Sequence, residues 1–134
     1  MLALAVGAPL LVVVTSFVAF DAPSEPPSPR AAAEEYFEAI TAERWDVAWD
    51  LLCSADRRDE QARRRYIDHW EESARLLPPL GDDPFTAARV RPDERSSVPA
   101  FFVEMVLPED YGSLPLGEVH VVWEDDAFHV CFDA

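Results

Sequence analysis

The spacing of apolar residues changes halfway along this chain, and the change restricts the fold more than any other feature of the sequence. Before Pro78 and Pro79, apolar side chains recur every three or four residues, which is the period of an amphipathic helix. After these prolines the period falls to two, which is typical of half-buried strands. Helices followed by a run of antiparallel strands predict an α+β domain whose sheet packs against the helices.

Three helices are expected before the prolines. The first has Ser28 as N-cap and Pro29 as first residue, the second begins near Trp45 and ends at Cys53, and the third runs from about Asp56 to Leu77. Their apolar stripes are Ala33, Tyr36, Phe37 and Ile40; Trp45, Ala48, Trp49 and Leu52; and Ala62, Tyr66, Trp70 and Ala74. The third helix also carries acid-before-base pairs four residues apart: Asp59 with Arg63, Glu60 with Arg64 and Glu71 with Arg75. We therefore interpret the run Arg63-Arg64-Arg65 as a solvated helix face.

Four strands are expected after the prolines. They are Phe85 to Arg91, Val98 to Leu107, Leu116 to Glu124 and Ala127 to Phe132. The last two should form a hairpin around Asp125 and Asp126. Together they predict a curved antiparallel sheet of about four strands. No glycine-rich phosphate loop interrupts this pattern.

The segment from Met1 to Phe20 carries no charged side chain and predicts a transmembrane helix. At ~1.5 Å per residue it would span roughly 29 Å, close to the hydrocarbon thickness of a bilayer. A proline-rich linker, residues 21–29, follows, and residues 30–134 form one domain. Nine residues of polyproline helix at ~3.1 Å each would place this domain about 28 Å from the membrane.

A cleaved signal peptide is the alternative interpretation of the first segment. It would need basic residues before the apolar run and small residues at a cleavage site, and neither is clear here. We therefore expect a single-pass anchor in the cell membrane. Charges beside this segment do not fix its orientation and a cytoplasmic domain is possible, but the cysteines and the acidic charge described next favour a C-terminal domain outside the cytoplasm. Secretion after signal cleavage remains the alternative.

Two cysteines, Cys53 and Cys131, lie near the two ends of the folded part. An even number of cysteines in an exported domain predicts a disulfide, and two buried free thiols are the alternative. A bridge closing so long a loop would stabilise the fold by about 4.5 kcal/mol. We expect no metal site, because neither cysteine has a close Cys or His partner and His129 is a lone neighbour of Cys131.

The formal net charge of −15 lies entirely after Phe20, and the chain has no lysine. A domain with this negative charge repels nucleic acid and anionic lipid, so we do not expect either as a partner. Basic residues stop at Arg95 while acidic residues continue, and we attribute this acidic surface to solubility rather than to cation binding.

The chain resembles the nuclear-transport-factor-2-like, or cystatin-like, superfamily, and within it the small membrane-tethered domains of actinobacterial cell envelopes. Three segments carry the resemblance: residues 31–40 (AAAEEYFEAI), residues 44–54 (RWDVAWDLLCS) and residues 127–131 (AFHVC). It implies a cone-shaped fold with a pocket between helices and sheet, and it implies that Cys53 and Cys131 are joined. Many members have no assigned activity, but some relatives are ketosteroid isomerases or dehydratases, which use an acidic or His base with a Tyr.

An enzyme of this kind would need a base and a hydrogen-bond donor around one pocket. The residue types that suit these roles are Tyr36 and Tyr66 on the helices and Glu118, His120 and His129 on the strands. A two-residue turn pairing Glu124 with Ala127 would place the last three on one face of the sheet, as a two-His-one-carboxylate possibility. A three-residue turn would move His129 to the opposite face.

The sequence thus predicts a non-enzymatic binding or accessory domain at the cell envelope, with a protein or a small molecule as partner and no cofactor. A small pocket enzyme of the isomerase or dehydratase type is the alternative. A third possibility is a structural domain that forms a homodimer through an apolar outer sheet face made of Val119, Val121 and Trp123.

Overall fold

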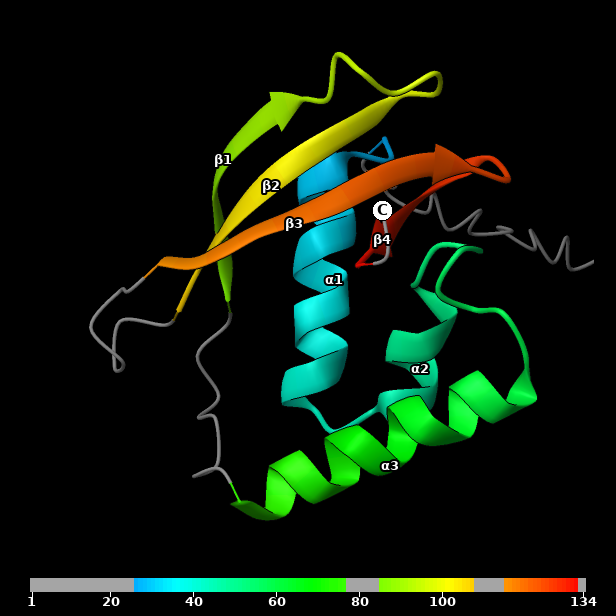
Figure 1. Cartoon of the computed structure of the whole chain (residues 1–134). Helices are drawn as coiled ribbons and strands as arrows, with labels where there is room; N and C mark the ends of the chain where they lie inside the picture. The colour runs from blue at the N-terminus through cyan, green and yellow to red at the C-terminus, as the bar shows by residue number, and fades with distance from the viewer. Residues whose placement is uncertain (1–25, 77–84, 108–114, 133–134) are drawn as a thin grey trace, which may run out of the picture.

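The computed structural model describes residues 26–76, 85–107 and 115–132, and it is an α+β fold with three helices followed by four strands (Figure 1). The helices are α1 (Pro29–Thr41), α2 (Trp45–Asp50) and α3 (Glu60–Leu76). The strands are β1 (Thr86–Pro92), β2 (Ala100–Val106), β3 (Pro115–Glu124) and β4 (Ala127–Cys131). The predicted α+β class, with three helices followed by a four-stranded antiparallel sheet, is confirmed, and most element boundaries agree within two residues.

The four strands form one antiparallel sheet in the order β1-β2-β3-β4. The β3–β4 hairpin closes with a two-residue turn, since Glu124 pairs with Ala127. Asp125 and Asp126 form this turn with φ of 52° and 62°, as the right-handed twist of a tight hairpin requires. The two-residue alternative is therefore the correct one.

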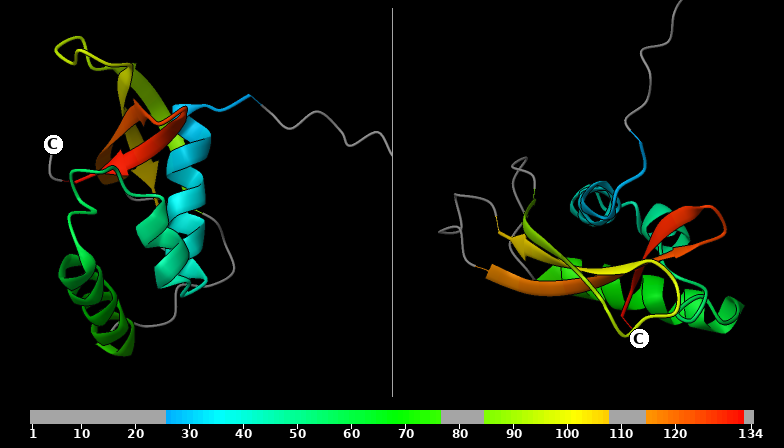
Figure 2. Two further views of the ribbon diagram at one scale, coloured as in Figure 1. Left: turned by 90° about the vertical axis from the view of Figure 1, so that its right-hand side faces the viewer. Right: turned by 90° about the horizontal axis from the view of Figure 1, so that it is seen from above.

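Helix α1 crosses one face of the sheet, and the core lies between them (Figure 2). Ser28 caps the helix, because its Oγ accepts a hydrogen bond of 3.0 Å from the backbone N–H of Ala31. Side chains of α1 also bind edge strand β1: Arg30 donates to the carbonyl of Ala87, and Glu34 accepts from its N–H at 3.2 Å. These bonds satisfy backbone groups beside a β-bulge.

Val119 and Val121 belong to the helix-facing side of the sheet, where they are 7% and 0% exposed. They share a face with Val103, which pairs with Val119 across the sheet. The expectation of an apolar outer face made of these valines is therefore wrong, because strand parity places them inward. The described helices leave the opposite face uncovered, and it carries Arg91, Phe102 and other polar or half-buried residues.

A short segment after α2 closes the other edge of the sheet. Leu52 pairs with Val130 of β4, and the backbone N–H of Cys53 donates to the Val130 carbonyl at 2.8 Å. Cys53 and Cys131 form a disulfide across 78 residues, with a Cα–Cα distance of 5.2 Å. The predicted bridge is confirmed, and the alternative of free thiols is excluded.

Helix α3 is attached to the rest of the fold mainly through α2. Trp70 of α3 stacks on Trp45 of α2, with ring centroids 5.8 Å apart and an interplanar angle of 11°. No residue of α3 is fully buried, although its aromatic side chains point toward the core. Glu60 pairs with Arg64 at 3.8 Å as expected, whereas Asp59 accepts a hydrogen bond from the Ala62 N–H at the start of the helix.

None of the helices in the described ranges is both long and apolar enough to cross a bilayer. The predicted transmembrane segment, Met1 to Phe20, lies outside the residues that the structure describes. Most of the predicted linker also lies outside them, and its last residue, Pro29, begins α1.

Candidate functional site

A cavity of about 410 Å³ lies between the three helices and the end of β4. Its volume falls in the ~300–1,000 Å³ range of small-molecule sites. The lining residues come from α1, α2, α3 and the segments beside the disulfide: Tyr36, Trp49, Leu52, Asp56, Arg58, Ala62, Arg65, Tyr66, His69, Trp70 and Phe132. The cavity exists because α3 lies across the ends of α1 and α2 without burying any residue completely (Figure 1).

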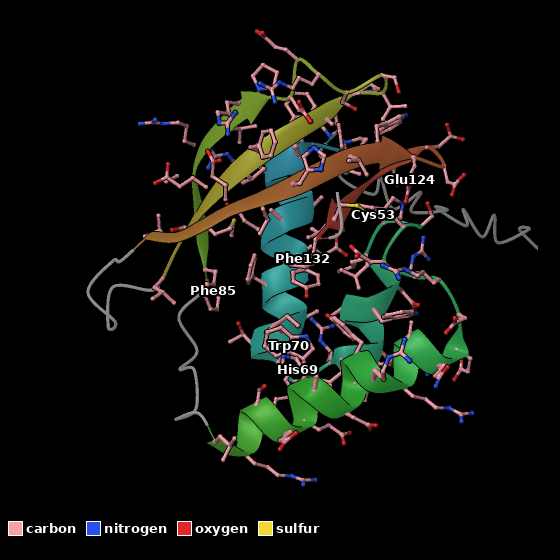
Figure 3. The ribbon with its side chains drawn as sticks, viewed as in Figure 1. Cys53, His69, Trp70, Phe85, Glu124 and Phe132 are labelled. Atoms are coloured by element: carbon pink, nitrogen blue, oxygen red, sulfur yellow. A yellow bond between two sulfur atoms is a disulfide. The ribbon has the colours of Figure 1, made fainter. Side chains whose placement is uncertain are left out.

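Five of the eleven lining residues are Tyr, Trp or Phe, and Figure 3 labels two of them, Trp70 and Phe132. Tyr66 lies between two tryptophans, with ring centroids 5.4 Å from Trp49 and 6.4 Å from Trp70. Phe132, just after β4, packs against Tyr36 at 5.6 Å. Such a wall presents flat apolar surfaces to a ligand, and aromatic rings prefer offset or edge contacts with other rings.

The inner end of the cavity contains a pair of tyrosine hydroxyls. The Oη atoms of Tyr36 and Tyr66 are 2.8 Å apart, and the Tyr36 residue is 1% exposed. Burial raises the pKa of both phenols, and for Tyr36 the neighbouring Tyr66 and the Asp56 carboxylate raise the pKa further. Both tyrosines are therefore neutral at physiological pH. One hydroxyl donates to the other, so the pair retains one O–H to donate, and the Trp70 side chain interacts with both hydroxyls.

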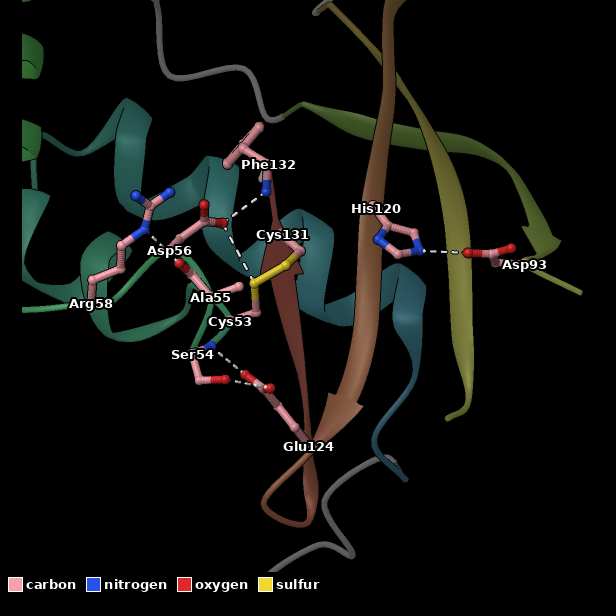
Figure 4. The surroundings of a disulfide bond; sticks show 10 residues. All are labelled: Cys53, Ser54, Ala55, Asp56, Arg58, Asp93, His120, Glu124, Cys131 and Phe132. Carbon is pink, nitrogen blue, oxygen red and sulfur yellow. Dashed lines mark hydrogen bonds and ion pairs between the residues drawn. A yellow bond between two sulfur atoms is a disulfide. The ribbon is translucent and has the colours of Figure 1, made fainter. Parts of the chain in front are cut away.

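Ionisable side chains occupy the rest of the lining: Asp56, Arg58, Arg65 and His69. Asp56 is held in place, because its Oδ2 accepts a hydrogen bond of 2.8 Å from the backbone N–H of Phe132. The same Oδ2 lies 3.5 Å from the Sγ of Cys53 (Figure 4). The disulfide thus holds Asp56 and Phe132, on two distant parts of the chain, at one side of the cavity.

Of the residues singled out from the sequence, Tyr36 and Tyr66 lie together in this cavity. Glu118, His120 and His129 do not line it. They share the uncovered face of the sheet, as the two-residue turn requires, because His120 pairs with Cys131 and Val122 pairs with His129. The structure therefore separates the tyrosines from the strand residues.

Glu118 and His120 belong to hydrogen-bonded pairs on that uncovered face. The Arg91 guanidinium donates to both carboxylate oxygens of Glu118, at 3.0 and 2.7 Å, and these bonds lower the pKa of Glu118. His120 Nε2 lies 3.0 Å from Asp93 Oδ2, and its ring packs against Phe102 at 4.8 Å. Hydrogen bonds, first from the Arg95 backbone and then from His120, lower the pKa of Asp93. These groups pair with one another, which is typical of a stabilising surface network, although His120 Nδ1 is buried without a hydrogen-bond partner among the described residues.

Sequence reasoning missed Asp56, Arg65, His69 and Phe132 as cavity residues. Helical spacing could have indicated two of them, since Arg65 and His69 lie three residues after Ala62 and Tyr66 of the apolar stripe of α3. No local signal points to Phe132, because its position depends on the disulfide and on the end of β4.

Within the described ranges, one group of residues has potential metal-ligand atoms close together: Cys53, Asp56 and Cys131, with these atoms within 4.8 Å of one another. The two sulfur atoms are bonded to each other and offer no thiolate to a metal ion. The arrangement is that of a disulfide with a neighbouring carboxylate.

The sequence matches no protein-family model and no curated protein.

Proposed function

We propose that this protein binds a small organic molecule in the aromatic cavity and does so without chemical conversion. The observation that carries the proposal is the cavity itself: about 410 Å³, walled by aromatic rings, with a buried tyrosine pair at its inner end. Flat apolar walls bind a ring by burial, and a few fixed polar groups orient it. Neutral tyrosines suit recognition, because they offer hydrogen bonds and no charge.

We further propose that the domain is a cystatin-like cone of the nuclear-transport-factor-2-like type. The support is the order of elements, with α1 crossing a four-stranded antiparallel sheet and a cavity at one end of the helical layer. The disulfide between the segment after α2 and the last strand agrees with the pattern that the resemblance implies.

The domain is placed outside the cytoplasm in this proposal, held by Met1 to Phe20 as a membrane anchor. The disulfide supports this location, since such bonds persist in oxidising compartments. A membrane-impermeant thiol reagent applied to intact cells should label the protein only after reduction. Labelling without reduction, or only after cell lysis, would contradict the location.

Binding is tested with 2-naphthamide, a neutral two-ring probe, and the full chain in lipid nanodiscs, by calorimetric titration with empty nanodiscs as blank. Ala62 lines the cavity from α3, so Ala62→Phe should fill the space and weaken binding at least about tenfold. Gln61→Phe adds the same ring to the exposed neighbouring position and should leave binding unchanged. A wild-type protein that does not bind, or two variants with equal affinity, would refute the proposed site.

A second function is favoured by one observation: the Asp56 carboxylate lines the same cavity as the tyrosine pair and raises the pKa of both tyrosines. A base and hydrogen-bond donors around one cavity are what proton abstraction beside a carbonyl needs. In this alternative Asp56 removes the proton and the tyrosine hydroxyls stabilise the developing oxyanion, as in an isomerase of ketosteroids.

The enzyme alternative predicts that the protein isomerises a 3-keto-Δ5-steroid, followed by the absorbance of the conjugated product. Asp56→Asn should abolish turnover. The amide oxygen of the introduced asparagine can still accept the hydrogen bond from the Phe132 N–H, so the fold should be preserved. Turnover that persists in this variant would exclude Asp56 as the base. If the wild-type protein shows no turnover, the enzyme alternative is refuted and binding stays the proposed function.

A further inference from the structure

Arg65 differs from the two arginines that precede it on α3. The guanidinium groups of Arg63 and Arg64 lie 3.9 and 3.8 Å from Glu60. Arg65 lines the cavity, and it has no ion pair or hydrogen bond to any residue in the described part of the chain. The interpretation of the arginine run as a solvated face therefore fits Arg63 and Arg64, whereas the third guanidinium is available at the cavity.

The charge at the cavity also differs from the charge of the chain. The protein carries a net charge of −15, but the ionisable lining consists of one carboxylate, two guanidinium groups and an imidazole. The carboxylate, Asp56, is already bonded to the Phe132 backbone, and Arg58 donates to the carbonyl of Ala55 at 3.2 Å. An anion approaching this acidic protein therefore finds a local excess of positive charge at the cavity, with Arg65 as its open partner.

The lining groups also differ in exposure. Tyr36 is 1% exposed, Trp70 is half-buried, and Arg65 is exposed. A ligand that contacts the buried tyrosine, the half-buried tryptophan ring and the exposed guanidinium group has a flat apolar body and one anionic end. Guanidinium groups bind carboxylates with two parallel hydrogen bonds, which fixes orientation as well as charge.

We infer that the ligand of this cavity is a small aromatic or alicyclic carboxylate, whose ring lies among Trp49, Trp70 and Phe132 and whose carboxylate binds Arg65. The inference rests on the proposed binding function and names its ligand class. The ring enters first, and the carboxylate stays at the mouth.

The experiment compares two probes of the same shape, 2-naphthoate and 2-naphthamide, which differ in a carboxylate and a neutral amide. Calorimetric titration of the full chain in nanodiscs should show 2-naphthoate binding at least about tenfold more tightly. Arg65→Gln should remove this preference, so that the two probes bind the variant with affinities within about twofold of each other. Arg64→Gln, with an exposed guanidinium paired to Glu60, is the matched control and should keep the preference.

The outcomes separate the inference from the proposed function. Equal affinity of the wild type for the two probes, or an undiminished preference in Arg65→Gln, would overturn the carboxylate assignment while cavity binding stands. Failure of both probes to bind would overturn both. Because Arg65 is exposed, its replacement leaves the fold intact, and a circular dichroism spectrum checks this.

Discussion

The two tyrosines of the cavity depend on each other at the level of single atoms. Their hydroxyls are 2.8 Å apart, and the Tyr36 residue is almost completely buried. A buried hydroxyl that loses its partner costs more than the bond contributes, because it keeps the desolvation penalty without compensation. The pair therefore constrains how α3 sits against α1.

This coupling predicts that Tyr66→Phe lowers the free energy of unfolding by about 1–2 kcal/mol. The double variant Tyr36→Phe/Tyr66→Phe should lose less than the sum of the two single variants, since it leaves no orphaned hydroxyl. Urea unfolding of all four proteins measures the coupling. Strict additivity would mean that the two hydroxyls do not interact.

The ion pair between Arg91 and Glu118 on the uncovered face of the sheet should make the stability of the protein depend on pH. Because Arg91 lowers the pKa of Glu118 in the folded state, this carboxylate contributes stability above its unfolded pKa of about 4.3. That contribution is lost as the pH falls through the lower folded pKa. Glu118→Gln should therefore reduce the melting temperature at pH 6, and the difference from wild type should close as the pH falls below about 4. Glu72→Gln, on the exposed surface of α3, serves as control, and a difference independent of pH would refute the assignment.

At the scale of elements, the β3–β4 hairpin decides which side chains share a face. Its turn places two aspartates in the left-handed region beside Glu124, whose carboxylate binds the backbone N–H and, at 2.9 Å, the Oγ of Ser54. The hairpin therefore also ties the sheet to the segment that carries Cys53.

Glycine adopts positive φ without steric cost, so Asp126→Gly should raise the free energy of unfolding by about 0.5–1 kcal/mol. Glu72→Gly, at an exposed position in the interior of α3, should instead lower it by a similar amount, since glycine weakens a helix. Urea denaturation compares the two variants. A loss of stability in Asp126→Gly would show that the aspartate makes a contact that glycine cannot replace.

The sequence predicted the elements well because their signals are local. Spacing placed the helices and strands, and Ser28 and Pro29 fixed the start of α1. The face of His129 stayed open until the turn length was known, since one added residue reverses strand parity. The polar part of the cavity was not predicted. Asp56 and Phe132 are distant in the sequence and lie together because of the disulfide, and the position of α3 across the ends of α1 and α2 depends on tertiary contacts.

For the molecule as a whole, the disulfide should supply a large part of the stability. Cys53 and Cys131 enclose a loop with a sequence separation of 78, for which the loop-entropy model gives about 4.5 kcal/mol. The variant Cys53→Ser/Cys131→Ser should therefore melt at least about 10 °C below the oxidised wild type. Wild type with reductant should match this variant. An unchanged melting temperature in both samples would show that the backbone pairing of Leu52 with Val130 suffices to hold this edge.

The same bond turns the segment from Cys53 to Cys131 into a covalent ring. Helix α3 and all four strands belong to the ring, whereas α1 and α2 precede it. A protease that cuts once between the two cysteines opens the ring but releases no fragment, so the nicked molecule still migrates as one species until its disulfide is reduced. A single cut in this region leaves every part of the cavity wall on one covalently joined molecule.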